Sequence, residues 1–428
     1  MEKLFKLKEN GTDVRTEVIA GITTFMTMAY IIFVNPDILS AAGMPFGPVM
    51  TATVVAAGVT TILAGVMSNY PYALASGMGL NAFFTFTIAA TAGWEAALGV
   101  VFLEGLVFLI LSLTGAINVI DAAIPHTLKR AVGVGIGLFI ALIGAVNGGL
   151  IQASPSTLIT RGDFTNKGTL LTIIGLVVIG ILMSLKVRGS MLIGILITAL
   201  IGIPMGVTNV TGSIIGKPES LAPLFMKMDI KGALDLGFMT IFAFWFVDVF
   251  DTVGTLMGTA SRANMLDEKG QLPRIRQSMT ADAIGTCLGA ALGTSTVTTY
   301  VESSAGVAEG GRTGLTAVVT GVLFLVALIF APLAGMIPSQ ATAPALIIVG
   351  VLMMLPVREI EWSDFTEALP AFMTIVMMPF AYSISDGIAT GFIIYPIVKL
   401  ATGKGKEIHW LVYVLGLLSI LHLAPGIL

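Results

Sequence analysis

The chain has 428 residues, of which 56% are hydrophobic and 11% charged, with a mean hydropathy of +0.95 and a formal net charge of −3. About a quarter of the residues of a soluble globular domain are charged, so this composition excludes a water-soluble body, and no basic run predicts a nucleic-acid partner. Two charge-free stretches, 38–94 and 313–357, can each hold two helical spans of roughly 20 residues, and the alternating pattern of a transmembrane β-barrel is absent. The sequence therefore predicts an all-α polytopic membrane protein.

Apolar segments along the chain predict about fourteen membrane spans. They cover residues 17–37, 47–68, 73–90, 95–119, 127–147, 168–186, 189–207, 233–258, 278–293, 297–311, 313–336, 342–357, 367–383 and 385–401. The C-terminal segment 403–428 holds a further apolar stretch, 410–423, which is expected to lie in the membrane interface or to form an extra span. The first hydrophobic segment has the length of a span and lacks a small-residue cleavage site, so we expect it to be retained.

Basic residues near the span ends predict the orientation in the membrane. The N-terminus is placed in the cytoplasm by four of them, Lys3, Lys6, Lys8 and Arg15. With fourteen spans, the basic positions 129–130 and 186–188 and the basic segment 261–276 fall on the same side. We therefore expect a multi-pass protein of the cell membrane with a cytoplasmic N-terminus.

A long loop outside the membrane, 208–232, divides the chain into two halves, 1–207 and 233–402. Each half contains seven predicted spans. Because seven is an odd number, the two halves would face opposite ways across the membrane. Such inverted repeats are common in secondary transporters.

The third predicted span of each half is interrupted. In YPYALASGMGLNAFFTFTIAATAG (70–93), Pro71, Gly77 and Gly79 interrupt the first part, and an uninterrupted helix is expected from about Leu80. In GTSTVTTYVESSAGVAEGG (293–311), β-branched residues favour an extended backbone, and a helix is expected from about residue 303 to 310. Paired interrupted spans at matching positions point to a transporter binding site, since unpaired backbone groups at membrane depth must line a cavity or be buried in protein.

Ionisable residues inside membrane spans are functional hypotheses by default. The segment FWFVDVFDTVGTLMG (244–258) places Asp251 deep in span eight, and Glu302 stands at the start of the expected half-helix in span ten, where the helix dipole favours its charge. Asn81 is the matching polar residue of span three. Together they would accept hydrogen bonds from a flat, neutral heterocycle and would repel an inorganic anion. We predict that these three residues bind the substrate.

A carboxyl that holds and releases a proton is what proton coupling requires. Asp248 lies three residues before Asp251, on the same helical face. The candidates for the coupling group are therefore Asp251, Glu302 and Asp248. The alternative for Asp248 is a structural hydrogen bond to a neighbouring helix.

Other acids are expected to be structural. Glu104, which appears far from the motifs in sequence, and Asp282 are expected to make hydrogen bonds within the bundle. Glu309 has a possible ion-pair partner in Arg312, and Asp386 has the position of a helix N-cap.

Aromatic and hydroxyl side chains near the predicted site are candidates for stacking and for minor hydrogen bonds. The aromatic candidates are Phe244, Phe250, Phe83 and Tyr30, and the hydroxyl candidates are Ser76, Thr299 and Ser303. The three histidines do not cluster, so no metal site is predicted, and no cofactor is expected.

With these residues in view, the chain resembles the nucleobase:cation symporter-2 superfamily, and more closely its adenine/guanine/hypoxanthine permease branch, the AzgA-like proteins. The segments that carry the resemblance are GITTFMTMAYIIFVNP in span one, ASGMGLNAFF in span three, FVDVFDTVGT in span eight and TYVESSAGVAEGGRTG in span ten. The resemblance covers essentially the whole chain, and these motifs are specific as a set.

The resemblance implies two inverted seven-span repeats arranged as a core domain (14–119 and 233–336) and a gate domain (120–207 and 337–402). Short strands in spans three and ten would flank the substrate. Asp251 and Glu302 fall on the two acidic purine-binding positions of the family, and Asn81 falls on its span-three polar position. The resemblance further implies import of purine nucleobases by proton symport, movement of the core against the gate, and often a homodimer.

One departure limits what can be carried over: where some uracil-type relatives have a histidine four residues after the span-eight carboxylate, this chain has Thr255. The proton coupling of those relatives therefore cannot be copied onto this chain. The alternatives to import of adenine, guanine or hypoxanthine are transport of another small heterocycle, such as uracil or xanthine, and an anion exchanger on the same fold. An intramembrane aspartyl protease is disfavoured because the second acid is Glu302 and no Gly-x-Gly-Asp context exists, so no enzyme activity is expected.

Overall fold

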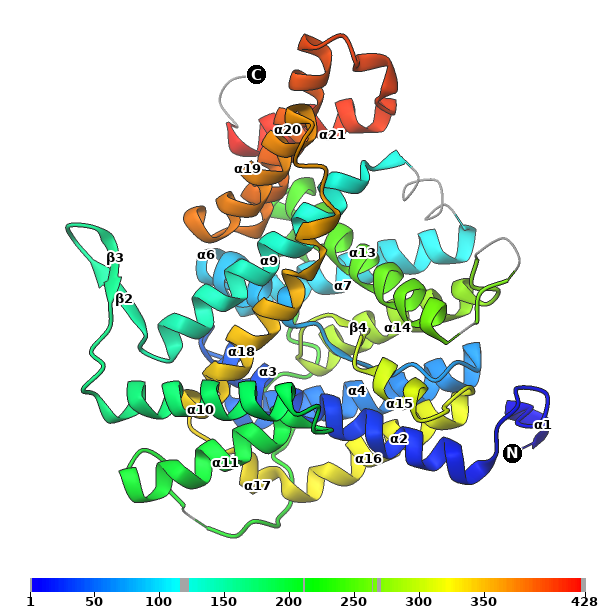
Figure 1. The fold of residues 1–428 in the computed structure, drawn as a ribbon, viewed down its shortest axis with the longest axis vertical. Helices are drawn as coiled ribbons and strands as arrows, with labels where there is room; N and C mark the ends of the chain where they lie inside the picture. The colour runs from blue at the N-terminus through cyan, green and yellow to red at the C-terminus, as the bar shows by residue number, and fades with distance from the viewer. Residues whose placement is uncertain (1, 116–122, 211, 264, 268–270, 425–428) are drawn as a thin grey trace.

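The computed structural model describes residues 2–115, 123–210, 212–263, 265–267 and 271–424, and Figure 1 shows a bundle of helices, with the strand pair β2–β3 projecting from it. The first half of the chain contains, in order, α1 (Glu2–Phe5), α2 (Val14–Met28), α3 (Ile31–Ser40), α4 (Phe46–Ser68), β1 (Leu74–Ser76), α5 (Met78–Ala82), the π-helix η1 (Phe83–Ala89), α6 (Ala90–Ala92), α7 (Trp94–Thr114), α9 (His126–Asn147), the strands β2 (Ile151–Ser154) and β3 (Leu158–Arg161), α10 (Lys167–Ser184) and α11 (Ser190–Met205).

The second half also places a short strand and a short helix third in its series of predicted spans. It contains α12 (Ile230–Asp235), α13 (Phe238–Arg262), α14 (Ile275–Leu292), β4 (Val297–Thr299), α15 (Ser303–Ala308), α16 (Gly314–Ala327), η2 (Leu328–Phe330), α17 (Ala331–Ala334), α18 (Ser339–Met353), η3 (Leu355–Glu359), α19 (Phe365–Ala381), α20 (Ile384–Ala401), η4 (Gly405–Glu407) and α21 (Trp410–Leu423).

Each predicted span coincides with a helix or with a broken segment of helix and strand. Within the described residues, nine helices are long and apolar enough to cross a membrane, and four shorter apolar helices accompany them, Met78–Ala92, Ser190–Met205, Phe365–Phe380 and Trp410–Leu423. The helical multi-pass class is thereby confirmed, while the number of spans stays a prediction. Parts of several predicted segments lie outside the described residues: 116–122 at the end of span four and the start of the gate domain, 211, 264, 268–270 and 425–428.

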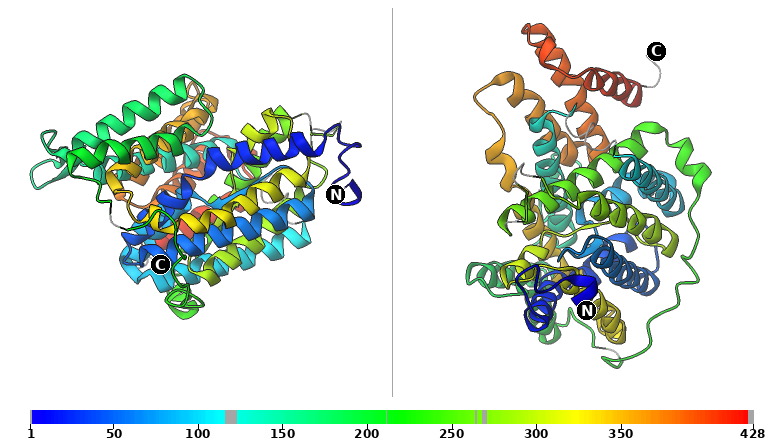
Figure 2. Two further views of the ribbon diagram at one scale, coloured as in Figure 1. Left: turned by 90° about the horizontal axis from the view of Figure 1, so that it is seen from below. Right: turned by 90° about the vertical axis from the view of Figure 1, so that its right-hand side faces the viewer.

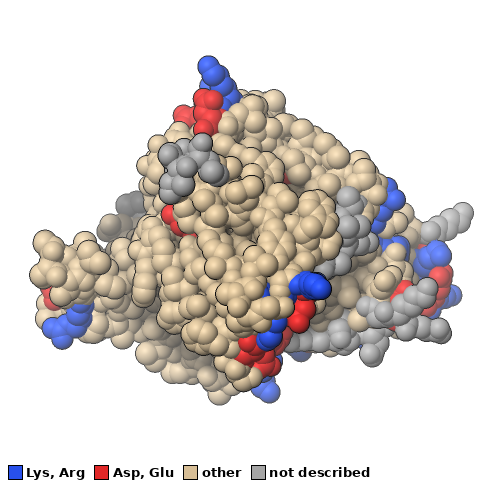
Figure 3. Space-filling view, turned by 90° about the horizontal axis from the view of Figure 1, so that it is seen from above, with Lys and Arg blue, Asp and Glu red and all other residues tan. Residues whose placement is uncertain are grey.

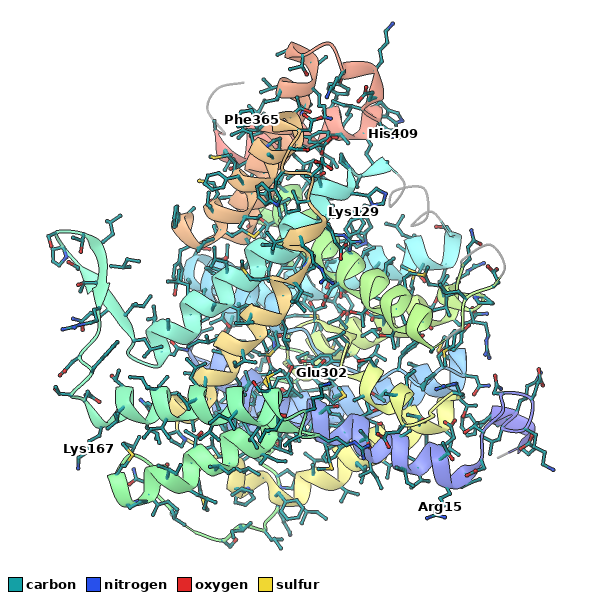
Figure 4. All side chains as sticks on the ribbon, viewed as in Figure 1. Arg15, Lys129, Lys167, Glu302, Phe365 and His409 are labelled. Atoms are coloured by element: carbon teal, nitrogen blue, oxygen red, sulfur yellow. The ribbon has the colours of Figure 1, made fainter. Side chains whose placement is uncertain are left out.

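The surface is that of a membrane protein. Large apolar side chains such as Ile181, Leu200 and Phe380 are 54%, 64% and 79% exposed. In the face shown in Figure 3, charged side chains gather in separate groups and leave broad uncharged areas between them. Figure 4 places Arg15 and Lys167, near the starts of predicted spans one and six, on opposite sides of the molecule, and the orientation in the membrane stays a prediction.

The two interrupted spans meet each other. Strands β1 and β4 pair antiparallel with Ala75 opposite Thr298. The ladder continues beyond the strands, because Gly77 N–H donates to the Thr296 carbonyl at 3.0 Å and Tyr300 N–H donates to the Ala73 carbonyl at 2.9 Å. This pairing satisfies backbone groups that would otherwise be unpaired at membrane depth. It confirms the predicted short strands in spans three and ten.

Packing between the halves is reciprocal. Helix α4 packs on α16 and α7 packs on α14, so the second segment of each half contacts the fourth segment of the other. Helices α9 and α18, the fifth segment of each half, pack on each other. Figure 2 shows α2, α16 and α4 lying side by side. A two-fold relation between inverted halves predicts such reciprocal contacts. The boundaries of the core and gate domains stay a prediction.

Span one differs from the sequence-based expectation, and helix α21 adds detail at the other end of the described chain. Span one is divided into α2 and α3, because Ile32 and Phe33 N–H groups bond three residues back in a 3₁₀-type turn. Helix α21 runs back along α20: the Tyr413 hydroxyl donates to the Gly405 carbonyl at 2.9 Å near one end, and His422 Nε2 lies 3.2 Å from Asp386 Oδ1 near the other. Both alternatives for residues 410–423, the membrane interface and an extra span, stay predictions.

Two expectations about structural acids are wrong. The N-cap of α20 is Ser383, whose hydroxyl accepts from the backbone N–H of Asp386, so Asp386 lies in the first turn instead. Glu309 pairs with Arg188, while Arg312 donates to the Val307 carbonyl at 2.7 Å. The partner of Glu309 comes from a segment distant in sequence, and the α20 cap comes from a residue three positions before Asp386.

An ion pair and a helix cap hold the connection before α19 in place. Asp364 caps the helix by accepting from Thr366 N–H at 2.9 Å, and Lys404 donates to its other oxygen at 2.8 Å. The hydrogen bond from Lys404 is the main cause that holds the pKa of Asp364 below its usual range.

Candidate functional site

A cavity of about 350 Å³ lies where the two broken spans meet α9, α13 and α18. This volume is in the range of small-molecule sites. Its lining from the span-one turn, the broken spans and α13 is Tyr30, Gly77, Met78, Gly79, Leu80, Val247, Phe250, Asp251, Gly254, Thr255, Thr298, Thr299, Tyr300, Val301 and Glu302. Its lining from α9, α18 and η3 is Lys129, Arg130, Val132, Gly133, Ile136, Val349, Leu352, Met353 and Pro356.

Two carboxyls face this cavity from different elements. Asp251 comes from the middle of α13 and is exposed, and Glu302 stands immediately before α15 and is half-buried. Figure 4 shows Glu302 near the middle of the molecule. Within the described part of the chain, no ion pair neutralises either side chain. The cavity therefore offers hydrogen-bond acceptors to a ligand that brings N–H groups.

Glycines bring the α5 backbone to the cavity wall. A Cβ on Gly79 would lie 2.5 Å from Ile136 Cγ2 of α9, and a Cβ on Gly77 would lie 2.7 Å from Thr298 Cγ2. The first N–H groups of any helix have no intrahelical partner. In α5 no side chain caps them, because the residue before the helix is Gly77. These backbone donors complement the two carboxyl acceptors.

The structure brings half of the predicted contact residues to the cavity. Asp251, Glu302, Thr299 and Phe250 line it. The Thr299 hydroxyl is engaged elsewhere, because it donates to Asp282 Oδ2 at 2.9 Å. Phe250 carries Lys129 Nζ over its ring at 4.9 Å from the centroid.

The other predicted contact residues lie behind the cavity wall. Phe244 is fully buried and stacks on Phe83, with ring centroids 4.8 Å apart. Ser76 bonds to Thr294 at 3.1 Å between hydroxyl oxygens, and the Ser303 hydroxyl accepts from Ala73 N–H at 3.0 Å. These side chains hold the broken segments in place and do not line the cavity.

Asn81 is also absent from the cavity lining. Its Nδ2 lies 3.5 Å from the Ser76 carbonyl, and its Oδ1 is buried without a hydrogen-bond partner among the described residues. Contact between Asn81 and a ligand therefore stays a prediction.

A second group of acids lies behind β4. Glu104 of α7, Asp248 of α13 and Asp282 of α14 are all 0% exposed. Glu104 accepts from the Thr296 hydroxyl at 3.1 Å, and Asp282 accepts from the Thr252 hydroxyl at 2.8 Å. The expected hydrogen bonds of Glu104 and Asp282 are confirmed, but the expectation that Glu104 lies far from the motifs is wrong, because α7 packs against α14 beside the strands.

Sequence reasoning missed the wall formed by α9 and α18. Ile136, Val349 and Met353 are ordinary apolar helix residues, and nothing in their spacing distinguishes a cavity wall from a lipid-facing or packed surface. Tyr30 was one of the aromatic candidates for stacking on a ligand ring, and it lines the cavity. In the structure its hydroxyl donates to Glu302 Oε1 at 2.7 Å.

A cavity between interrupted membrane helices, with acids and backbone donors in its wall, is typical of a membrane transporter. Solved structures share the fold. The transmembrane domain of the cyanobacterial bicarbonate transporter BicA is similar with a TM-score of 0.66 at 16% identity, over 88% of this chain and 97% of that one. The anion transporter SLC26A9 is similar with a TM-score of 0.65 at 11% identity, over 91% of this chain and 66% of that one.

Residues 15–390 match the permease family, and the chain belongs to that family. A permease of Methanocaldococcus jannaschii is 51% identical over 98% of this chain and 97% of its own length. The guanine/hypoxanthine permease PbuG of Bacillus subtilis is 47% identical over 99% of both chains. The adenine permease AdeP of Escherichia coli is 44% identical over 98% of this chain and 95% of its own length. The resemblance to the nucleobase:cation symporter-2 branch is thereby confirmed, and the protein is a transporter and not an enzyme.

Proposed function

We propose that this permease imports purine nucleobases by proton symport across the cell membrane, with its N-terminus in the cytoplasm. The observation that carries the proposal is the pair Asp251 and Glu302 in one cavity of about 350 Å³. Purine rings present N–H groups to acceptors and carry ring nitrogens or a carbonyl that accept from backbone N–H groups. Relatives that are adenine and guanine/hypoxanthine permeases support this class of substrate.

The two carboxyls in the cavity favour a neutral purine over an anion as the ligand. The structural neighbours include a bicarbonate transporter and an anion transporter. Two carboxylates in a small cavity would repel such anions. A neutral heterocycle that donates hydrogen bonds suits the same cavity. Adenine, guanine and hypoxanthine are the first candidates, and another small heterocycle such as uracil or xanthine is the second.

We further propose that the cavity lies between a core domain (14–119 and 233–336) and a gate domain (120–207 and 337–402), which move against each other during transport. The cavity is lined by α13 and the broken spans on one side and by α9 and α18 on the other. Asp251, Glu302 and Asp248 are the proposed carriers of the coupling proton. A homodimer is the proposed assembly.

The test is uptake of radiolabelled adenine, hypoxanthine, guanine and uracil by cells that express the protein, with and without a protonophore and with and without sodium. We expect uptake of at least one purine that the protonophore abolishes and sodium removal leaves unchanged. Uptake of uracil alone would contradict the purine assignment. Uptake that depends on sodium and resists the protonophore would contradict proton symport.

A further inference from the structure

Tyr30 joins the first span to the cavity acid of the tenth. Its side chain is 1% exposed, and its hydroxyl lies 2.7 Å from Glu302 Oε1. The two residues are 272 positions apart in the chain, and both line the cavity. This contact brings the phenol of one half of the protein onto the carboxyl of the other.

Among the residues that the structure describes, the Tyr30 hydroxyl is the only side-chain donor to the carboxyl of Glu302. Glu302 occupies the N-cap position of α15 but makes no side-chain capping bond. Its carboxyl is therefore not held by the helix that follows it. One oxygen is held by Tyr30, which leaves Oε2 as the acceptor that is free to meet a ligand.

The position of Tyr30 depends on the break in span one. Tyr30 stands at the junction of α2 and α3, where the 3₁₀-type turn interrupts the helix. The Thr27 hydroxyl, one turn earlier, lies 3.5 Å from the Glu302 carbonyl oxygen. The end of α2 thus lies beside the backbone of Glu302, and the turn after it places the Tyr30 hydroxyl next to the Glu302 carboxyl.

We propose that Tyr30 is a positioning residue for purine binding: it fixes the Glu302 carboxyl so that Oε2 accepts a hydrogen bond from the ring. This inference rests on the proposed function. Hydrogen bonds to charged groups are stronger than those between neutral groups and constrain geometry. A carboxyl without its donor would rotate and would bind the ring less well.

The test is the variant Tyr30→Phe, which removes the hydroxyl and keeps the ring. We expect the KM for purine uptake to rise by about tenfold or more, the effect of losing one charge-assisted hydrogen bond, while Vmax changes by less than about twofold. The matched control is Tyr72→Phe. Tyr72 is 2% exposed, its hydroxyl contacts Met265 Sδ at 3.8 Å, and it does not line the cavity. We expect its KM to stay within about twofold of the wild type.

A double-mutant cycle separates positioning from a general loss of structure. Purine binding to purified protein is measured by equilibrium dialysis for the wild type, Tyr30→Phe, Glu302→Gln and the double variant. We expect Tyr30→Phe to weaken binding in the wild-type background and to have little further effect beside Glu302→Gln. An unchanged KM in Tyr30→Phe, or an equal loss of affinity in both backgrounds, would overturn the inference. Absence of purine uptake and binding by the wild type would overturn the proposed function itself.

Discussion

At the residue scale, the acids around the broken spans form two groups that differ in their surroundings. Asp251 and Glu302 face the cavity, whereas Glu104, Asp248 and Asp282 are fully buried beside β4. Threonine hydroxyls from α13 and the broken span ten supply most of the donors to the second group. Asp248 belongs to this second group, so a direct contact with substrate is not part of its proposed role.

This division predicts different outcomes for two isosteric amide variants. Asp251→Asn is expected to reduce purine uptake by about a hundredfold or more, because the cavity loses a carboxyl that binds the ring and is a candidate for the proton. Glu104→Gln keeps a carbonyl acceptor for Thr296 and is expected to reduce uptake by less than about fivefold. Initial rates of uptake at matched membrane levels check this. Equal losses in the two variants would indicate that coupling is spread over both groups of acids.

The sequence could identify those residues whose role shows in their local sequence, and not those whose role depends on contacts between distant segments. Asp251 and Glu302 could be predicted because a carboxyl within an apolar or broken span is itself unusual. The bond from Tyr30 to Glu302 could not be predicted, because the partners are 272 residues apart. Ser76 and Ser303 were assigned to the substrate because they lie next to the site in sequence, whereas the β1–β4 pairing directs their hydroxyls to other partners.

At the element scale, close helix packing depends on glycines. Helices α4 and α16 approach each other closely. A Cβ on Gly314 would clash with the Gly65 carbonyl oxygen, and a Cβ on Gly65 would lie 2.6 Å from the Gly314 carbonyl oxygen. Small residues that allow such approach are the usual basis of helix association in membranes. The contact fixes α16 against the bundle that carries the broken spans.

Gly314→Ala is therefore expected to force the two helices apart and to destabilise the protein by about 1–3 kcal/mol or more. The matched control is Gly180→Ala in α10, where a Cβ would meet nothing within 4 Å. We expect this control to be neutral or slightly stabilising, since alanine is the better helix former. Thermal unfolding in detergent measures both. A Gly314→Ala protein as stable as the control would contradict the proposed role of the close approach.

The broken spans were predictable as elements because glycine, proline and a run of β-branched residues are local signals. The break in span one was not predictable in the same way. GITTFMTMAYIIFVNP reads as a continuous apolar segment, and its only proline, Pro36, lies inside α3 and not at the turn. Contacts made at the turn, including the bond from Tyr30 to Glu302, accompany a break that local propensity does not indicate.

At the scale of the whole molecule, one contact joins the proposed core and gate on the side opposite the basic residues of α9. The Thr342 hydroxyl of α18 donates to Asp37 Oδ2 of α3 at 2.6 Å. In the predicted orientation this contact lies toward the outside. The cavity reaches Arg130, whose side chain is 45% exposed, on the predicted cytoplasmic side. The proposed movement of the core against the gate would have to break this contact.

Linking these two positions is expected to stop transport. In a Cys287→Ser background, the pair Asp37→Cys and Thr342→Cys is treated with a short thiol-specific cross-linker, and uptake should fall and should return on reduction. The control pair is Thr172→Cys and Gln340→Cys, which joins α10 and α18 within the proposed gate, where the Thr172 hydroxyl donates to the Gln340 carbonyl at 3.2 Å. Equal inhibition by both cross-links, or none by the first, would contradict the proposed core and gate movement.

The central claim is that Asp251 and Glu302 together bind the imported purine. It is tested most directly by radiolabelled adenine, guanine and hypoxanthine uptake in Asp251→Ala and Glu302→Ala, at membrane levels matched to the wild type. We predict that each variant loses purine uptake while the protein remains in the membrane. Wild-type uptake in either variant would contradict the assignment of the site.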